Sequence, residues 1–108
     1  MDQDASLVKL KLDEDNDLTF EVTIEGDVSG SPMFRLVCDA GDMSYGFRGK
    51  RSEEGVTFTV PALESKLKGG TYDMHLEVII ENKILIPIQL KAQFEIATRA
   101  VVESITVG

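Results

Sequence analysis

The densest group of side chains that could bind a metal ion is the acidic run from Asp13 to Asp17, D-E-D-N-D. Hard oxygen ligands of this kind suit Ca²⁺. An EF-hand loop that starts at Asp13 would need glycine at position 18 and glutamate at position 24, but the chain has Leu18 and Ile24 there. The alternative is a solvated turn whose Asp and Asn side chains cap their own backbone. We favour the turn, and we predict neither a metal nor a cofactor.

Cys38 and His75 are the only cysteine and the only histidine of the chain, and a nucleophilic pair would need both. In the alternating strands that we predict around them, Cys38 falls on the inward side and His75 on the outward side. A zinc site would require further ligands of these types. We therefore expect Cys38 to act as a small buried hydrophobe, and we predict no catalytic residues. A small metal-dependent or hydrolytic enzyme without a recognisable motif is the alternative.

One basic cluster, residues 48–51 (R-G-K-R), follows Phe47 and could contact phosphate. Three cations in a chain of net charge −8 are more simply explained as partners of Glu53 and Glu54 nearby. An acidic surface repels the nucleic-acid backbone and anionic lipid. We therefore expect neither nucleic acid nor membrane as a partner.

Length and composition indicate one globular domain. A chain of 108 residues, 43% of them hydrophobic, is long enough to bury a core. The single cysteine suits a reducing compartment. Met1 is followed by acidic residues, so we predict no signal peptide. The longest apolar run, Ile84 to Ile88, is far shorter than the roughly 20 residues of a membrane-spanning helix. We expect a cytoplasmic protein, or one assembled inside a cell.

Two long alternating runs flank residues 81–83 (E-N-K) and predict an antiparallel hairpin over residues 68–96. Such a hairpin has an apolar face that a second sheet must cover. Pro87 lacks an N–H and implies an edge, a bulge or a break in the returning strand. The residues predicted to point inward are Tyr72, Met74, Leu76, Val78, Ile80, Ile84, Ile86, Ile88, Leu90, Ala92, Phe94 and Ile96.

The rest of the chain also alternates between apolar and polar residues. The pattern predicts strands over residues 5–12, 18–25, 34–38, 43–47 and 56–60, a charged loop over residues 48–55 and a single short helical turn over residues 62–68. We expect the first two strands to form a hairpin or to lie side by side in one sheet. Short strands at regular spacing with almost no helix favour an all-β, antiparallel β-sandwich of about seven strands.

One local pattern resembles a known family. Leu63 and Leu67, followed by G-T-Y at residues 70–72, resemble the E–F corner of immunoglobulin-like domains. The resemblance implies a single immunoglobulin-like domain over residues 1–108, with residues 1–4 and 98–108 as flexible or edge segments. It also implies that the Tyr72 hydroxyl bonds to backbone between Pro61 and Gly69. The antibody-type cysteine and tryptophan are absent, which favours an intracellular or viral member.

Residues 77–88 (E-V-I-I-E-N-K-I-L-I-P-I) carry a second resemblance. With the Gly-Thr-Tyr entry, the tight polar turn and the proline of the return strand, they are similar to the late hairpin of immunoglobulin-like domains in structural and head-assembly proteins of tailed phages. This resemblance implies a non-catalytic structural or assembly module, located in the cytoplasm or the virion.

The outward side of the predicted hairpin is less polar than a solvent-facing surface, because Ile79, Leu85 and Pro87 lie there. Such a patch can bind another protein or a second copy of the chain. It can equally be covered by the strand-like residues 100–107, and the sequence leaves both interpretations open. We predict these three residues as the partner-binding site.

Overall fold

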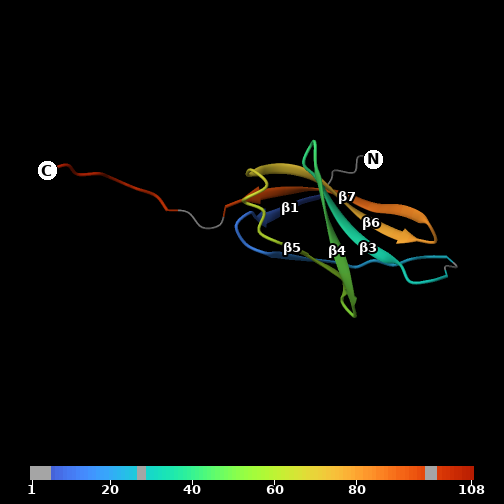
Figure 1. The fold of residues 1–108 in the computed structure, drawn as a ribbon. Helices are drawn as coiled ribbons and strands as arrows, with labels where there is room; N and C mark the ends of the chain where they lie inside the picture. The colour runs from blue at the N-terminus through green and yellow to red at the C-terminus, as the bar shows by residue number, and fades with distance from the viewer. Residues whose placement is uncertain (1–5, 27–28, 97–99) are drawn as a thin grey trace.

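The computed structural model describes residues 6–26, 29–96 and 100–108 (Figure 1). Its strands are β1 (Ser6–Lys11), β2 (Asn16–Phe20), β3 (Met33–Asp39), β4 (Ser44–Ser52), β5 (Gly55–Val60), β6 (Gly70–Ile80) and β7 (Lys83–Glu95). The prediction of an all-β chain with about seven strands is confirmed. In the ranges given above, the structure has no helix long and apolar enough to cross a membrane.

The seven strands join into one sheet in the order β1-β7-β6-β3-β4-β5-β2, and the sheet curls until it nearly closes on itself (Figure 1). Of the six strand pairs among the described residues, β1–β7 is parallel and the other five are antiparallel. The prediction that the first two strands are neighbours is wrong, because β1 and β2 form the two opposite edges of the sheet.

The turn between β1 and β2 explains this separation. The Leu12 N–H donates to the Glu95 carbonyl at 2.7 Å, which extends the contact with β7, and the Leu12 side chain is buried. The Asn16 side chain then bonds both the N–H and the C=O of Lys11, at 2.9 and 2.8 Å. These bonds carry the chain from one layer of the curled sheet to the other instead of folding it back on β1.

Strand β4 belongs to both layers, because its residues 44–48 pair with β3 and its residues 49–52 pair with β5. The predicted charged loop over residues 48–55 is therefore mostly strand. Gly49 makes the change of partner feasible. A Cβ atom at Gly49 would lie 2.6 Å from side-chain atoms of both Val56 and Phe58, a distance that real side chains do not tolerate.

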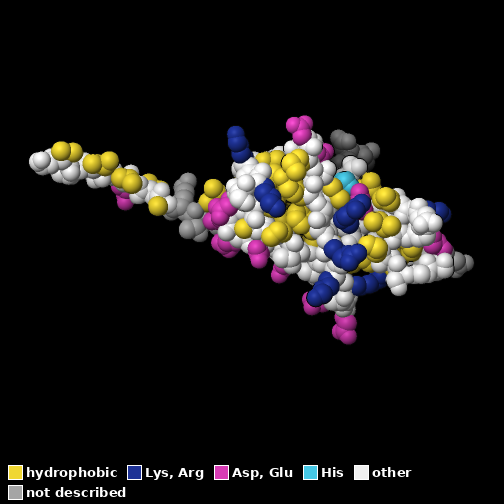
Figure 2. Space-filling view, in the orientation of Figure 1, with side chains coloured by type: hydrophobic (Ala, Val, Ile, Leu, Met, Phe, Trp, Pro, Cys, Tyr) yellow, Lys and Arg dark blue, Asp and Glu magenta, His cyan; other side chains and the backbone are white. Residues whose placement is uncertain are grey.

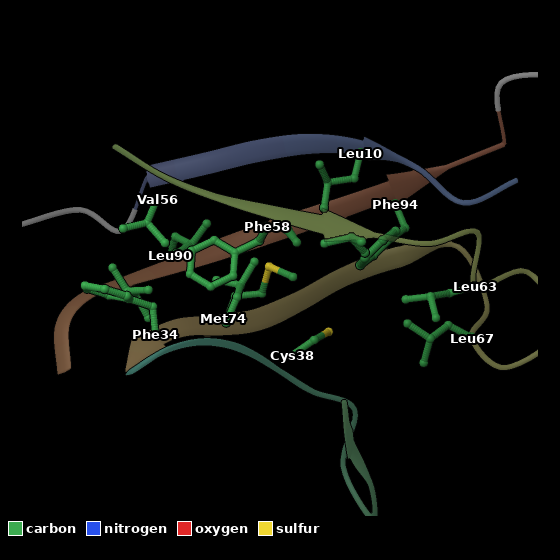
Figure 3. Close-up of a cluster of buried hydrophobic side chains, with 14 of the residues drawn as sticks. Leu10, Phe34, Cys38, Val56, Phe58, Leu63, Leu67, Met74, Leu90 and Phe94 are labelled. Carbon is green, nitrogen blue, oxygen red and sulfur yellow. The ribbon is translucent and has the colours of Figure 1, made fainter. Parts of the chain in front are cut away.

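The core lies between the two layers and contains the inward side of every strand. Figure 3 shows side chains of both layers, among them Phe58 of β5 and Met74 of β6, meeting in one cluster. The side chains with no exposed surface at all are Leu36, Cys38, Phe58, Val60 and Ala92. Burial of this apolar surface is the main favourable contribution to folding.

The corner before β6 has the predicted form. The Leu67 N–H donates to the Leu63 carbonyl at 2.8 Å, which closes one helical turn, and both leucines are buried. The Tyr72 hydroxyl donates to the Lys68 carbonyl at 2.8 Å. The predicted bond from Tyr72 to the upstream backbone is thus confirmed.

The β6–β7 hairpin turns tightly and then changes register. Glu81 and Asn82 both have left-handed φ angles, 51° and 64°, as a two-residue hairpin turn of type I′ requires. Val78 lies opposite Leu85, but Leu76 lies opposite Ile88. β7 therefore holds one extra residue between these two pairs, a β-bulge that includes Pro87.

Residues 100–108 follow the last strand and pair with no other segment of the described chain. All nine of these residues are exposed. Figure 1 shows the segment leading away from the strands. The predicted strand-like character of residues 100–107 therefore has no partner within the described part of this copy.

Candidate functional site

Apolar side chains form an exposed row at the end of the β6–β7 hairpin. Met33 of β3 lies opposite Ile79 of β6, which lies opposite Ile84 of β7, so the three share the outer face of adjacent strands. Met33 is 46% exposed and Ile84 56%. Leu85 and Ile86, next along β7, are also exposed. We call these five residues the hairpin-tip patch; Figure 2 shows hydrophobic atoms at the surface over β3, β6 and β7.

The bulge changes which side chains form this surface. Ile84 and Ile86 were predicted to point into the core, but both are exposed. Leu85 was predicted to point outward, yet it lies opposite the buried Val78 and so shares the inner face. The inward–outward assignment was wrong here because the extra residue reverses the alternation between the turn and Ile88.

The predicted partner-binding residues therefore occupy different positions. Ile79 is half-buried in the exposed row, Leu85 is exposed opposite Val78, and Pro87 is exposed on the bulge. Sequence analysis missed Met33, Ile84 and Ile86. No local signal could have found Met33, because its place in the row depends on the pairing of β3 with β6.

A groove opens along the seam between the two layers, on the side of β2. Phe20 and Val22 form one wall, and Leu76, Pro87 and Ile88 form the other, around a volume of ≈ 330 Å³. We call these five residues the seam groove. Among the described residues, β1 pairs with β7 only from Leu90 onward, so no described strand lies beside the first half of β7 on this side.

The chain beyond β2 borders this groove with an unpaired backbone. Residues 21–25 continue the alternation of β2, with exposed residues between the half-buried Val22 and Ile24. They pair with no strand of the described chain. Sequence analysis predicted a strand here but not that its last residues would lack a partner.

A charged cluster lies one row below the hairpin-tip patch. Glu77 Oε1 accepts a hydrogen bond from Arg35 Nε at 2.8 Å and another from Arg35 Nη2, and Glu77 Oε2 lies 2.8 Å from His75 Nε2. The bond to His75, together with the bond and charge of Arg35, lowers the pKa of Glu77 against the opposing effect of burial. A carboxylate held in this way is a weak base, so the cluster suits structural pairing and not proton transfer.

The two residues of the conceivable nucleophilic pair are not brought together. Cys38 lies opposite Met74 on the inner face, and His75 lies opposite Val37 on the outer face. Burial, with a smaller contribution from the Asp39 charge, raises the pKa of the Cys38 thiol to about 11. At neutral pH the group is therefore an unreactive thiol.

The acidic turn directs its side chains to separate neighbours. Asp15 Oδ1 accepts from the Ala62 N–H at 3.1 Å, and Asp17 Oδ1 accepts from the Thr59 hydroxyl at 2.7 Å. Within the described ranges, no three His, Cys, Asp or Glu side chains converge in a way that could hold a metal ion. The oxygens of Asp15 and Asp17 stabilise the junction with β5.

The basic cluster lies on β4 instead of in a loop. The Arg51 guanidinium lies 5.4 Å from the centroid of the Phe34 ring, and Arg48 lies directly opposite Arg35. None of the ion pairs among the described residues joins the cluster to Glu53 or Glu54, the partners that the sequence suggested. Arg51 thus covers the apolar end of the core.

No protein-family model, no curated protein and no solved structure matches this chain. A function is therefore inferred from the surfaces of the molecule itself.

Proposed function

We propose that the chain is a non-catalytic structural module that makes protein–protein contacts through the hairpin-tip patch. The observation that carries this proposal is the apolar row Met33–Ile79–Ile84 at the end of the hairpin, on a chain of net charge −8. Ile86 and Leu85, on opposite faces of β7 at the same end of the hairpin, are also exposed. Like charges keep such molecules apart, so a contact between them must be local and apolar. An exposed cluster of large aliphatic side chains meets that need.

An immunoglobulin-like class for this module is supported by its topology and its corner. The parallel β1–β7 pair, the neighbours β6 and β3, and the opposite layer of β2 and β5 follow the strand arrangement of such sandwiches. The Tyr72 bond and the buried Leu63 and Leu67 match their E–F corner. The departure is β4, which runs through both layers and links them into one nearly closed sheet.

We further propose a tailed-phage structural or head-assembly protein as the context, in the cytoplasm or the virion. The support is the resemblance of residues 77–88, together with the Gly-Thr-Tyr entry at residues 70–72, the tight turn at Glu81 and Asn82 and the proline in the return strand. A hydrolytic or metal-dependent enzyme has less support, because Cys38 and His75 lie on opposite faces. The net charge of −8 disfavours nucleic acid and membrane as partners.

Sedimentation velocity over a range of protein concentrations tests the patch. We expect Ile84→Lys, and likewise Leu85→Lys, to weaken self-association at least tenfold while far-ultraviolet circular dichroism stays unchanged, because a buried charge at the contact would lack a partner. Leu7→Lys is the matched control, since Leu7 is 54% exposed on β1, away from the patch. If Leu7→Lys weakened self-association as much as Ile84→Lys, the hairpin-tip patch would not be the contact surface.

A wild type that sediments as a monomer at every concentration would exclude contact with a second copy through this patch. A photoreactive side chain at position 84 then tests for a different protein. Crosslinking that is lost when the same group is placed at position 7 instead would identify the patch as the contact. Equal crosslinking from both positions would contradict it.

A further inference from the structure

We propose that residues 101–107 of one copy add as a β-strand to the seam groove of a second copy. The inference rests on the proposed role as a protein-contact module, but it uses two surfaces other than the hairpin-tip patch. The partner that it assigns is a second copy of this chain. The mode of contact is the addition of a strand at an open sheet edge.

The donor segment has the composition of a strand but no partner. Val101, Val102, Ile105 and Val107 are 69–89% exposed. In an extended chain, Ile105 and Val107 share one side with Val101 and Glu103, and Ser104 and Thr106 lie on the other side with Val102. β-Branched residues with one mostly apolar side favour a half-buried strand, and an extended segment of this kind is costly to leave in water.

The acceptor offers both an edge and an apolar floor. The backbone of residues 21–25 pairs with no described strand and forms one wall, and Phe20, Val22, Leu76 and Ile88 line the space beside it. Phe20 and Val22 are only half-buried in this copy. A strand laid in the groove would pair with residues 21–25 and would bury these side chains against its own apolar side.

Two occupants from the same copy fit less well. Residues 1–5 (M-D-Q-D-A) contain two aspartates and no β-branched residue, and Met1 is their one large apolar side chain. The C-terminal segment of the same copy leaves β7 at Glu95, and Pro87 lies eight residues earlier along this strand, roughly 27 Å away at about 3.4 Å per residue. To reach the groove, that segment would have to run back along the edge of β7 that β1 already occupies.

The donor and acceptor surfaces are different, so each copy carries one of each. Such a heterologous contact leaves a free segment at one end and a free groove at the other, and it propagates unless it closes into a ring. We therefore expect the wild type to form a concentration-dependent series of oligomers. Salt should strengthen the association, because it screens the repulsion between copies of charge −8.

The decisive experiment mixes two full-length variants. Ile105→Asp with Val107→Asp disables the donor, and Thr23→Pro disables the acceptor edge, because proline lacks the N–H that a pairing strand needs. Thr23 is exposed and pairs with no described strand, so this change should spare the fold. We expect each variant alone to associate at least tenfold more weakly than wild type, and the mixture to form a one-to-one dimer from the intact donor and the intact acceptor.

Ser104→Asp with Thr106→Asp is the matched control, since it adds the same charge to the polar side of the segment. We expect it to associate within about threefold of wild type. The proposal is overturned if this control weakens association as much as Ile105→Asp with Val107→Asp, or if the mixture stays monomeric while both variants remain folded. A wild type that is monomeric at every concentration also overturns it.

A second variant guards against an effect of Thr23→Pro on folding. Val22→Asp places a charge in the groove wall, and its mixture with the donor variant should give the same dimer. The experiments test the hairpin-tip patch and the seam groove separately. If Ile84→Lys does not weaken association but the mixture forms a dimer, the patch is not a contact and this inference stands. The reverse pattern retains the patch and removes this inference.

Discussion

The β6–β7 hairpin is one continuous element with two very different halves. At its base, Met74, Leu90 and Phe94 are each 2% exposed. At its tip, Ile84, Leu85 and Ile86 are 46–56% exposed. Both halves are rich in aliphatic residues, and both are paired across the hairpin. The difference lies in what covers them.

On the inner face of the base, Phe58 of β5 belongs to the same buried cluster as Met74 (Figure 3). At the edge, the described residues of β1 pair with β7 from Leu90 to Glu95 and with no residue nearer the tip. The bulge at Pro87 separates the two halves and reverses the alternation between them. Amphipathic alternation thus specifies that a strand forms, while neighbours distant in sequence decide which of its side chains become core. The tip keeps its apolar residues available for contacts.

The largest expected effect comes from deleting a side chain at the base. Phe94→Ala should lower the free energy of unfolding by about 3–5 kcal/mol, because it leaves a cavity beside Tyr72, whose ring packs edge-on against Phe94 at 5.8 Å. Ile84→Ala at the tip should change it by no more than about 0.5 kcal/mol. Urea titration of both variants measures the difference. Equal losses would mean that the tip is core, and the comparison would fail.

A smaller effect is expected from the corner that fixes the start of β6. Tyr72→Phe removes the bond to the Lys68 carbonyl but keeps the packed ring, so it should cost about 0.5–1.5 kcal/mol. Tyr45→Phe is the control, because its hydroxyl contacts only the Met43 sulfur, at 3.9 Å. The same denaturant titration applies. A control that loses as much as Tyr72→Phe would mean that the corner bond contributes nothing specific.

The smallest effect concerns Glu77, at the boundary between base and tip. Because its pKa is lowered in the folded chain, its stabilising contribution is present above the ordinary carboxyl pKa and is lost as pH falls through the folded value. Glu77→Gln should therefore be less stable than wild type at neutral pH, and the gap should shrink below roughly pH 4. Urea titrations at a series of pH values measure this gap.

Glu14→Gln serves as the comparison for that pH series. Glu14 forms only an exposed ion pair with Lys11, at 3.6 Å, so its removal should produce little change at any pH. A gap between wild type and Glu77→Gln that stays constant from neutral to acidic pH would contradict the role assigned to Arg35 and His75.

Most of the strands could be predicted from the sequence, because alternation is a local property. Proline at position 87 also predicted an edge, a bulge or a break, and the structure has a bulge on a partly free edge. The sequence did not predict which side of the sheet Ile84, Leu85 and Ile86 face. One extra residue reverses the alternation, and its position depends on the pairing with β6.

The remaining features could not be predicted because they depend on pairing between strands that are distant in sequence. Residues 13–17 look like a hairpin loop, yet the Leu12 backbone bond and the Asn16 side-chain bonds direct the chain to the opposite edge of the sheet. The predicted contact surface included Ile79 but not Met33, and the Arg35–Glu77 bond joins residues 42 positions apart. Such features require the pairing register between distant strands, which no local pattern contains.

The parallel pairing of β1 with β7 also has a mechanical consequence. Ser6 lies beside Leu90 and Lys11 beside Glu95, so the chain enters β1 at one end of this ladder and leaves β7 at the other. Tension between the two ends of the chain therefore acts along the strands, in shear. All the hydrogen bonds of the ladder bear that load together, whereas a hairpin pulled at its open end would lose its bonds one at a time. In the assembly that we propose, a copy held by its C-terminal segment would transmit force to its neighbour without peeling open.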